Sequence, residues 1–243
     1  MKKILFAAML FAALIPMAVA QSISTASSSA VRGNGHGASL SHLPPKAPSW
    51  CKPCLYYSGD IDTTNPNADG IWDNNYSGGE VDGQIFGAFK NTTKTVKATG
   101  GAINAFGGPT TTDPTPWQIN TKMSAGNGGK VVCSGSGTTT IKATGRTDSN
   151  WGVPDEYSVI EKKFKKACSL KKGSYWLLIY PQSTNLWYES DEESDPKPIN
   201  HVGWKNVIDK SIFNSTYFGF NYAYANTIGD AGGDDFSFGL IGK

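Results

Sequence analysis

One stretch of the chain, residues 172–181, constrains the fold more than any other. A turn glycine near its start is followed by six consecutive apolar or aromatic residues, and a proline ends it. A run of this length between two breakers is typical of a strand that is apolar on both faces, as in the centre of a β-sandwich. We therefore expect a central strand here, with Trp176 in the core on the same face as Leu178 and Tyr180.

The rest of the chain also indicates sheet. Short apolar or alternating runs recur between turn residues, and the chain has 28 Gly and 13 Pro. No alternation of strands with helices is visible. This pattern predicts an all-β fold, a β-sandwich or jelly roll of roughly nine to eleven antiparallel strands.

Two segments qualify this prediction. Residues 157–170 are ambiguous, because Ile160, Phe164 and Cys168 stand four apart as on a helix, whereas the neighbouring strands favour a strand or irregular structure. Residues 216–224 alternate clearly, so we expect a strand with its aromatic residues on one face.

The N-terminus has the pattern of a secretory signal. Lys2 and Lys3 precede an almost wholly apolar stretch at 4–15, and a small-x-small pattern ends at Ala20. We expect residues 1–20 to be a signal peptide and residues 21–49 a flexible Ser/Gly/Pro-rich linker. Residues 50–243 then form a single β-sandwich domain, and the mature protein is secreted, extracellular or periplasmic, with no membrane span.

Charge argues against some partners. The whole chain has 22 Lys+Arg and 20 Asp+Glu, and the predicted signal removes two lysines and no acid. A mature chain with a net charge near zero is a poor candidate for nucleic-acid binding. A lysine-rich cluster at residues 162–172 is interpreted as a solvated face, with the acidic run at 189–195 as a potential counterpart.

The four cysteines predict two disulfides, since an exported chain meets an oxidising compartment. Three pairings fit the sequence. We favour Cys51–Cys54, which are close in sequence, and Cys133–Cys168, which would cross-link two core segments.

The first pair lies in Trp50-Cys51-Lys52-Pro53-Cys54, which resembles the redox motif of the thioredoxin family. That chemistry needs a cysteine at a helix N-terminus after a buried strand. Here a proline-rich stretch precedes the motif and an extended stretch follows it. We therefore reject an oxidoreductase centre in favour of a structural disulfide.

A second candidate is a calcium loop. The residues with suitable oxygen atoms and spacing are Asn65, Asn67, Asp69 and Asp73, with a turn glycine at position 70. Calcium takes six to eight oxygen ligands, but position twelve of this loop is Tyr76 where a Glu is needed. A plain solvent loop would use the same residue types, so calcium stays an alternative for this segment.

Loop-borne aromatic residues give the strongest functional indication. Their rings can stack on apolar sugar faces, although aromatic residues also fill cores. The candidate glycan contacts are Trp72, Trp151, Trp187, Tyr188 and Trp204.

No catalytic constellation stands out. Glu156, Glu161, Asp234 and Asp235 could supply a carboxylate pair, but their spacing selects no two of them. His201 is the one candidate base in the folded region, and no serine elbow accompanies it.

Several motifs resemble a family of exported bacterial β-sandwich proteins that often carry a C-terminal Pro-Glu-Pro sorting tail. They are Gly145-Arg146, Tyr157, Gly173-Ser174-Tyr175-Trp176 and Pro181-Gln182, with Trp117-Gln118-Ile119 upstream. The sorting tail is absent here. The resemblance implies a β-sandwich and export, and it assigns no activity.

The sequence thus predicts an exported protein whose best candidate function is non-catalytic binding of a polysaccharide or cell-surface glycan. The alternatives are a structural or surface-associated envelope or matrix protein and a jelly-roll glycoside hydrolase.

Overall fold

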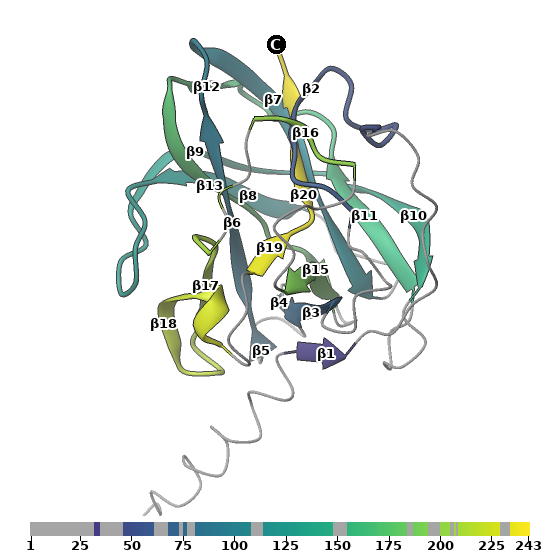
Figure 1. Cartoon of the computed structure of the whole chain (residues 1–243), viewed down its shortest axis with the longest axis vertical. Coiled ribbons are helices and arrows are strands. Elements are labelled where there is room, and N and C mark those ends of the chain that lie inside the picture. The colour runs from purple at the N-terminus through teal and green to yellow at the C-terminus, as the bar shows by residue number, and fades with distance from the viewer. Residues whose placement is uncertain are drawn as a thin grey trace, which may run out of the picture.

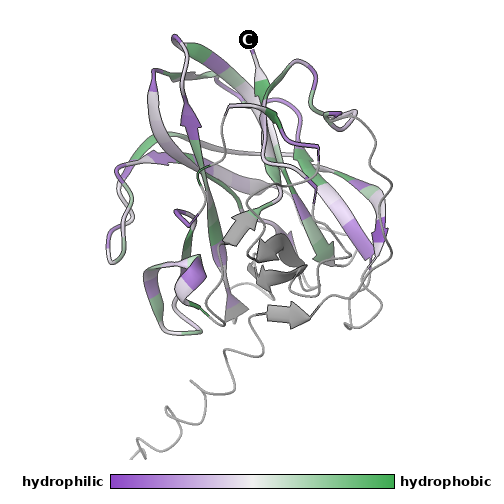
Figure 2. Ribbon diagram, viewed as in Figure 1, coloured by the Kyte–Doolittle hydropathy of each residue, from purple (hydrophilic) through white to green (hydrophobic). Residues whose placement is uncertain are grey.

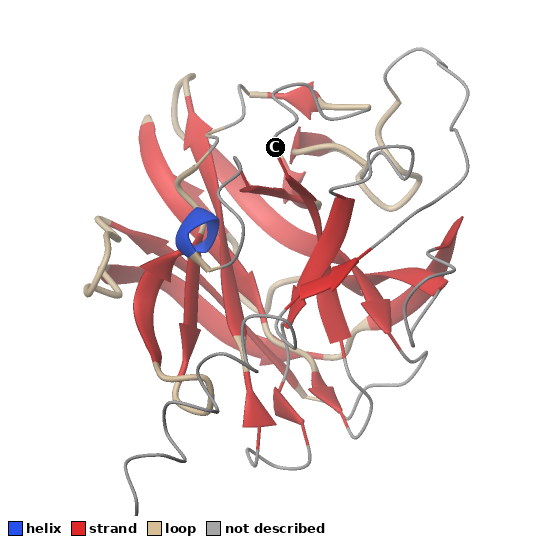
Figure 3. Cartoon of the chain, turned by 60° about the horizontal axis from the view of Figure 1, so that its bottom comes forward, coloured by secondary structure: helices blue, strands red, loops and turns tan. Residues whose placement is uncertain are grey.

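The computed structural model describes residues 32–34, 46–60, 68–72, 75–76, 81–107, 114–147, 155–183, 187–193, 200–204, 207, 209–228 and 234–243. At 32–34, 68–72, 75–76, 81, 187–193 and 234–235 only the backbone is described. Strands make up nearly all of the regular structure, and a short 3-10 helix, η1 (Ala225–Thr227), is the only helical element in the described residues (Figure 3). The protein is an all-β sandwich, as the sequence predicts.

The strands are β1 (Arg32–Asn34), β2 (Cys54–Tyr57), β3 (Ala68–Trp72), β4 (Asn75–Tyr76), β5 (Val81–Asp82), β6 (Gln84–Asn91), β7 (Val96–Gly107), β8 (Thr115–Thr121), β9 (Lys130–Gly137), β10 (Thr140–Thr147), β11 (Asp155–Glu161), β12 (Cys168–Leu170), β13 (Gly173–Ile179), β14 (Gln182–Ser183), β15 (Trp187–Glu193), β16 (Val202–Gly203), β17 (Ile212–Ser215), β18 (Phe220–Tyr224), β19 (Asp234–Phe236) and β20 (Phe238–Gly242). These twenty segments within the described residues exceed the predicted nine to eleven, because several are only two or three residues long.

Two antiparallel sheets form the layers (Figure 1). The larger sheet has the order β1-β3-β15-β7-β20-β2-β16, and β10, β11, β12 and β19 join it beside this path. The second sheet has the order β18-β17-β6-β13-β8-β9. A small third sheet, β14-β4-β5, includes one parallel pair.

The predicted central strand is β13, which pairs with β6 on one side and β8 on the other. Its odd residues, such as Leu177 and Ile179, join the main core cluster between the sheets, and its even residues join a second cluster. Trp176, Leu178 and Tyr180 belong to this second cluster, each 8% exposed or less. The strand is therefore apolar on both faces, as predicted. In Figure 2, hydrophobic residues, drawn in green, occur along strands of both sheets.

The sheets approach closely where β6 crosses β20. A Cβ atom added at Gly87 would lie 2.5 Å from the ring of Phe238. The absence of a side chain at Gly87 thus lets the Phe238 ring, which is 1% exposed, fill the core.

A disulfide also joins the two layers. Cys133 on β9 and Cys168 on β12 are bonded, with their Cα atoms 5.8 Å apart. Since β9 lies at the edge of the smaller sheet and β12 belongs to the larger, this bond is the predicted cross-link between core segments.

The structure assigns one ambiguous segment and shortens one predicted strand. Residues 157–170 contain most of β11, an irregular connection and β12, so the interpretation as strand or irregular structure is confirmed and the helical alternative is wrong. The predicted strand at 216–224 begins too early, because residues 216–219 form a turn between β17 and β18. The hydroxyl of Ser215 accepts a hydrogen bond from the Phe218 backbone N–H, and Gly219 has a φ of 76°, which together make this turn.

Parts of the predicted linker lie beside the sandwich. Within it, β1 pairs with β3, and the Lys46 backbone N–H donates to Asn200 Oδ1 at 3.3 Å. Residues 1–31, which include the predicted signal, lie outside the described part of the chain. In the described residues no helix has the length and apolar character needed to cross a membrane.

Candidate functional site

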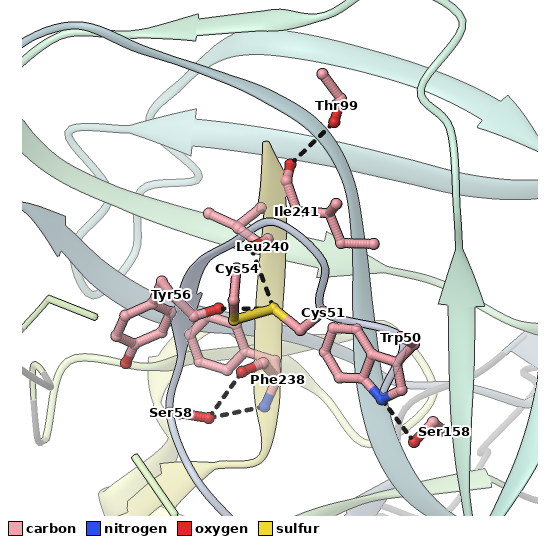
Figure 4. The surroundings of a disulfide bond; sticks show 10 residues. All are labelled: Trp50, Cys51, Cys54, Tyr56, Ser58, Thr99, Ser158, Phe238, Leu240 and Ile241. Carbon is pink, nitrogen blue, oxygen red and sulfur yellow. Dashed lines mark hydrogen bonds between the residues drawn. A yellow bond between two sulfur atoms is a disulfide. The ribbon is translucent and has the colours of Figure 1, made fainter. Parts of the chain in front are cut away.

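A disulfide holds the segment that carries the candidate site. Cys51 and Cys54 are bonded, and Cys54 begins β2 instead of a helix. Cys51 is 2% exposed, and its sulfur lies 3.5 Å from the carbonyl oxygen of Leu240 on β20 (Figure 4). The bond is therefore the predicted structural clasp, and it fastens the chain next to Trp50 onto the larger sheet.

Trp50 is half-buried and anchored along one edge. Its Nε1 donates a hydrogen bond to the Ser158 hydroxyl at 3.1 Å (Figure 4). Its ring meets Tyr57 edge-on, with the centroids 5.7 Å apart and the planes at 88°. The indole lines two cavities, so a fixed aromatic ring stands at the boundary between them.

The site lies on the outer face of the larger sheet. Along β11, Val159 belongs to the core between the sheets, whereas its neighbours Ser158 and Ile160 line the cavities. Successive side chains of a strand point to opposite faces. Residues 46–54 therefore cover the solvent side of this sheet, with the cavities beneath and beside them.

The first cavity has a volume of about 250 Å³ and a mostly polar lining. Lys46 and Lys142 belong to this lining and are exposed. The lining also contains Asp60, Asn104 and Arg146, which belong to a buried polar network.

Arg146 on β10 is held between two carboxylates. Its Nη1 donates to Asp60 Oδ1 at 2.6 Å and its Nη2 to Glu156 Oε2. Thr144 also donates to Glu156 Oε2, at 2.6 Å. The Arg146 and Asp60 side chains are 10% and 12% exposed, and that of Glu156 is fully buried. Burial alone would lower the pKa of Arg146, but the opposing charges, chiefly that of Glu156, raise it above its ordinary value.

A chain of hydrogen bonds connects this ion pair to Trp50. The Tyr57 hydroxyl donates to Asp60 Oδ1 at 2.5 Å and accepts from Asn104 Nδ2 at 2.8 Å. Asn104 Oδ1 in turn accepts from Ser158 at 2.5 Å, and Ser158 accepts from the indole. Burial, and then the charge of Asp60, raises the pKa of Tyr57 well above its ordinary value, so this hydroxyl stays a neutral donor.

The second cavity, of about 380 Å³, combines lysines with apolar groups. Lys52, Lys142 and Lys162 line it and are exposed. Ile160 and Ile241, which are 1% and 6% exposed, provide apolar lining beside Trp50. No acidic residue contributes to the described lining of this cavity. A cationic and partly apolar hollow thus adjoins the polar one.

Trp204, one of the predicted glycan contacts, is a core residue instead. It is 7% exposed and stacks on Phe89 and Tyr56, with ring centroids 6.1 and 6.2 Å away. His201 packs edge-on against Tyr56 in the same region, and its Nδ1 lies 3.1 Å from the Ser58 carbonyl oxygen. Both side chains support the fold, and neither lines the two cavities.

The other predicted aromatic contacts are placed only in part. Trp72 lies in β3 and Tyr188 lies opposite it in β15, while Trp187 pairs with Gly107 of β7. These three residues are in paired strands and not in loops, and their side chains lie outside the described part. Trp151 lies outside the described residues altogether.

The predicted calcium loop is likewise mostly outside the described residues, which include neither Asn65, Asn67 nor Asp73. Asp69 lies in β3, where its backbone pairs with Asn34 and Asp191. Its position is therefore in a sheet, which corrects the expectation of a continuous loop. Among the described side chains, no group of three or more His, Cys, Asp or Glu is placed to hold a metal ion.

Sequence reasoning missed the residues that form the candidate site. In the sequence, Trp50 stands out only as part of the cysteine motif, and Arg146 only as part of the Gly145-Arg146 motif. Lys162, predicted to lie on a solvated face, is exposed and also lines the second cavity. An isolated arginine in a strand of small polar residues was the one available signal for a buried ion pair.

No family model, no curated protein and no solved structure matches the chain. A function is therefore argued from the geometry of the site alone.

Proposed function

We propose that this protein is an exported β-sandwich that binds a glycan without cleaving it, with Trp50 as the aromatic platform. The observation that carries the proposal is the position of the Trp50 indole, fixed by Ser158 and Tyr57 and lining two adjacent cavities. Ligand sites commonly combine a concave surface, an aromatic or apolar wall and a few placed polar groups. A sugar has both an apolar ring face and hydroxyls, which such a site can contact together.

The polar network supports this function by fixing the site before a ligand arrives. Asp60, Asn104 and Ser158 are tied to one another through Tyr57 or directly, so their orientation is set by the protein. A prearranged site loses less conformational entropy on binding than a mobile one. Export is supported by the signal pattern of residues 1–20 and by two disulfides, which persist in oxidising compartments.

The hydrolase alternative receives no comparable support. Glu156, one of the four acidic residues considered for a catalytic pair, is 1% exposed and lines neither cavity. Its Oε2 atom interacts with Arg146 and Thr144. It therefore has a structural role in the ion pair.

A glycan array tests the proposal. The mature wild-type protein is expected to bind at least one polysaccharide class, and Trp50→Ala is expected to abolish that signal. Trp50→Phe, which keeps a smaller ring, should retain part of it. Tyr217→Ala is the matched control, because Tyr217 is an aromatic residue that is 53% exposed and lines neither cavity. Absence of binding by the wild type, or full binding by Trp50→Ala with its fold intact, would contradict the proposal.

A further inference from the structure

We infer that the ligand of this site is an anionic saccharide, whose acidic group lies in the second cavity between Lys52, Lys142 and Lys162. This inference rests on the proposed glycan-binding function and names the chemical class of the glycan. The expected ligand is an oligosaccharide that carries carboxylate, sulfate or phosphate groups.

The first argument is charge. Three lysines line one cavity of about 380 Å³, and its described lining includes no acidic residue. None of the three lysines forms an ion pair with a described acidic residue, and Lys142 donates only to the neutral Ser49 hydroxyl, at 2.7 Å. Like charges around one hollow repel one another, and an anion placed among them relieves that repulsion.

The first cavity does not neutralise this charge. Its one acidic lining residue, Asp60, has one oxygen bound by Arg146 and Tyr57, and its other oxygen accepts from Asn200. Both oxygens of the Asp60 carboxylate are therefore already engaged inside the network. Lys142 lines both cavities, so the positive charge lies at their junction.

The second argument is the apolar lining. Ile160, Ile241 and the Trp50 ring line the same cavity as the lysines. A free inorganic anion has no apolar part that could contact this surface. The ring of an acidic sugar would contact the apolar residues while the charged group of the sugar binds the lysines. The adjoining polar cavity then offers hydrogen-bonding groups to a neighbouring sugar unit.

The third argument concerns extent. The sequence outside the predicted signal has equal numbers of basic and acidic residues. A nucleic acid needs a basic surface that neutralises many phosphates along its backbone. The lysines here converge instead on one hollow, which fits a single acidic sugar unit better than an extended polyanion.

The test uses oligogalacturonates, oligomannuronates and sulfated chondroitin oligosaccharides, each measured by isothermal titration calorimetry. The matched neutral probes are the methyl-esterified uronates and methyl-esterified chondroitin without sulfate. They keep the sugar backbone and lose the carboxylate and sulfate charges. At least one acidic probe should bind at least about tenfold more tightly than its neutral counterpart, as a charge-assisted contact would give. Its affinity should fall between 50 and 300 mM salt on the order of severalfold, because ions screen the lysines.

Single variants Lys52→Gln, Lys142→Gln and Lys162→Gln should each weaken the acidic probe by roughly fivefold or more, and by a larger factor than they weaken the neutral probe. Lys165→Gln is the control, since Lys165 is an exposed lysine of the same segment that does not line the cavity. Equal affinity for acidic and neutral probes, with Trp50→Ala still abolishing both, would overturn this inference and keep the proposed function. Binding to no saccharide, or lysine-dependent binding to an oligonucleotide alone, would overturn both.

Discussion

The buried ion pair of Arg146 is the most sensitive point of the candidate site. Replacing Arg146 with methionine keeps much of the side-chain volume and leaves Asp60 and Glu156 without their shared cation. Because these side chains are 12% and 0% exposed, solvent cannot replace the guanidinium fully. Removing one partner of a buried pair costs about 3–5 kcal/mol. For a protein of this size each kcal/mol lowers the melting temperature by about 2–4 °C, so Arg146→Met should lose about 6–20 °C.

The assay is urea unfolding followed by tryptophan fluorescence, with thermal unfolding as a second reading. The double variant Arg146→Met/Glu156→Gln removes one stranded charge and should recover part of the lost stability, giving a coupling free energy of about 1 kcal/mol or more. Lys165→Met, at an exposed lysine, should change stability by no more than about 0.5 kcal/mol. A loss below about 1 kcal/mol for Arg146→Met, or strictly additive effects in the cycle, would refute the role assigned to this ion pair.

Three further predictions concern the frame around the site. Burial raises the pKa of Tyr57 in the folded state, so the unfolded chain loses this proton first as the pH rises above about 10, and the free energy of unfolding should fall there. Urea unfolding at pH 9, 10 and 11 should show a shallower fall for Tyr57→Phe than for the wild type. Identical pH dependence of the two proteins would contradict the shift in pKa. Replacing Cys133 and Cys168 by alanine removes a link between residues 35 apart and should cost about 4 kcal/mol in the same assay. Loss of the other disulfide, whose residues are three apart, should cost about 2 kcal/mol. A larger loss for the shorter loop would show that loop length does not determine how much each disulfide stabilises the protein. Gly87→Ala should cost about 1–3 kcal/mol by thermal unfolding, because its Cβ atom would clash with the buried ring of Phe238. Gly173→Ala should be nearly neutral, because the nearest atom to its Cβ would be 3.6 Å away. Equal losses of stability for the two variants would contradict the close approach of the sheets.

The fold was largely predictable because its signals are local. The apolar run at 172–181 predicts a strand buried on both faces, and β13 has that environment. The cysteine count and spacing led to both disulfides. Where the prediction was wrong, a local contact decided the structure, as at 216–219, where Ser215 and Gly219 form a turn inside an alternating pattern.

The candidate site was not predictable in the same way, because its parts are far apart in sequence. Trp50 is anchored by Ser158, 108 residues away, and Asp60 meets Arg146 across 86 residues. No spacing rule connects such positions. Among the predicted aromatic contacts, Trp204 fills the core, since the sequence pattern does not show which indoles stay half-exposed.

The central claim, that Trp50 forms the floor of a saccharide site, is tested most directly by the indole N–H resonances in NMR. The protein is titrated with the tightest-binding oligosaccharide of the array, and the Trp50 resonance is assigned by its loss in Trp50→Phe. The Trp50 signal is expected to shift progressively to saturation. The signal of Trp176, whose Nε1 donates to the Lys210 carbonyl at 2.7 Å on the smaller sheet, is expected to stay in place. A Trp50 resonance that does not move at saturating saccharide would contradict the claim.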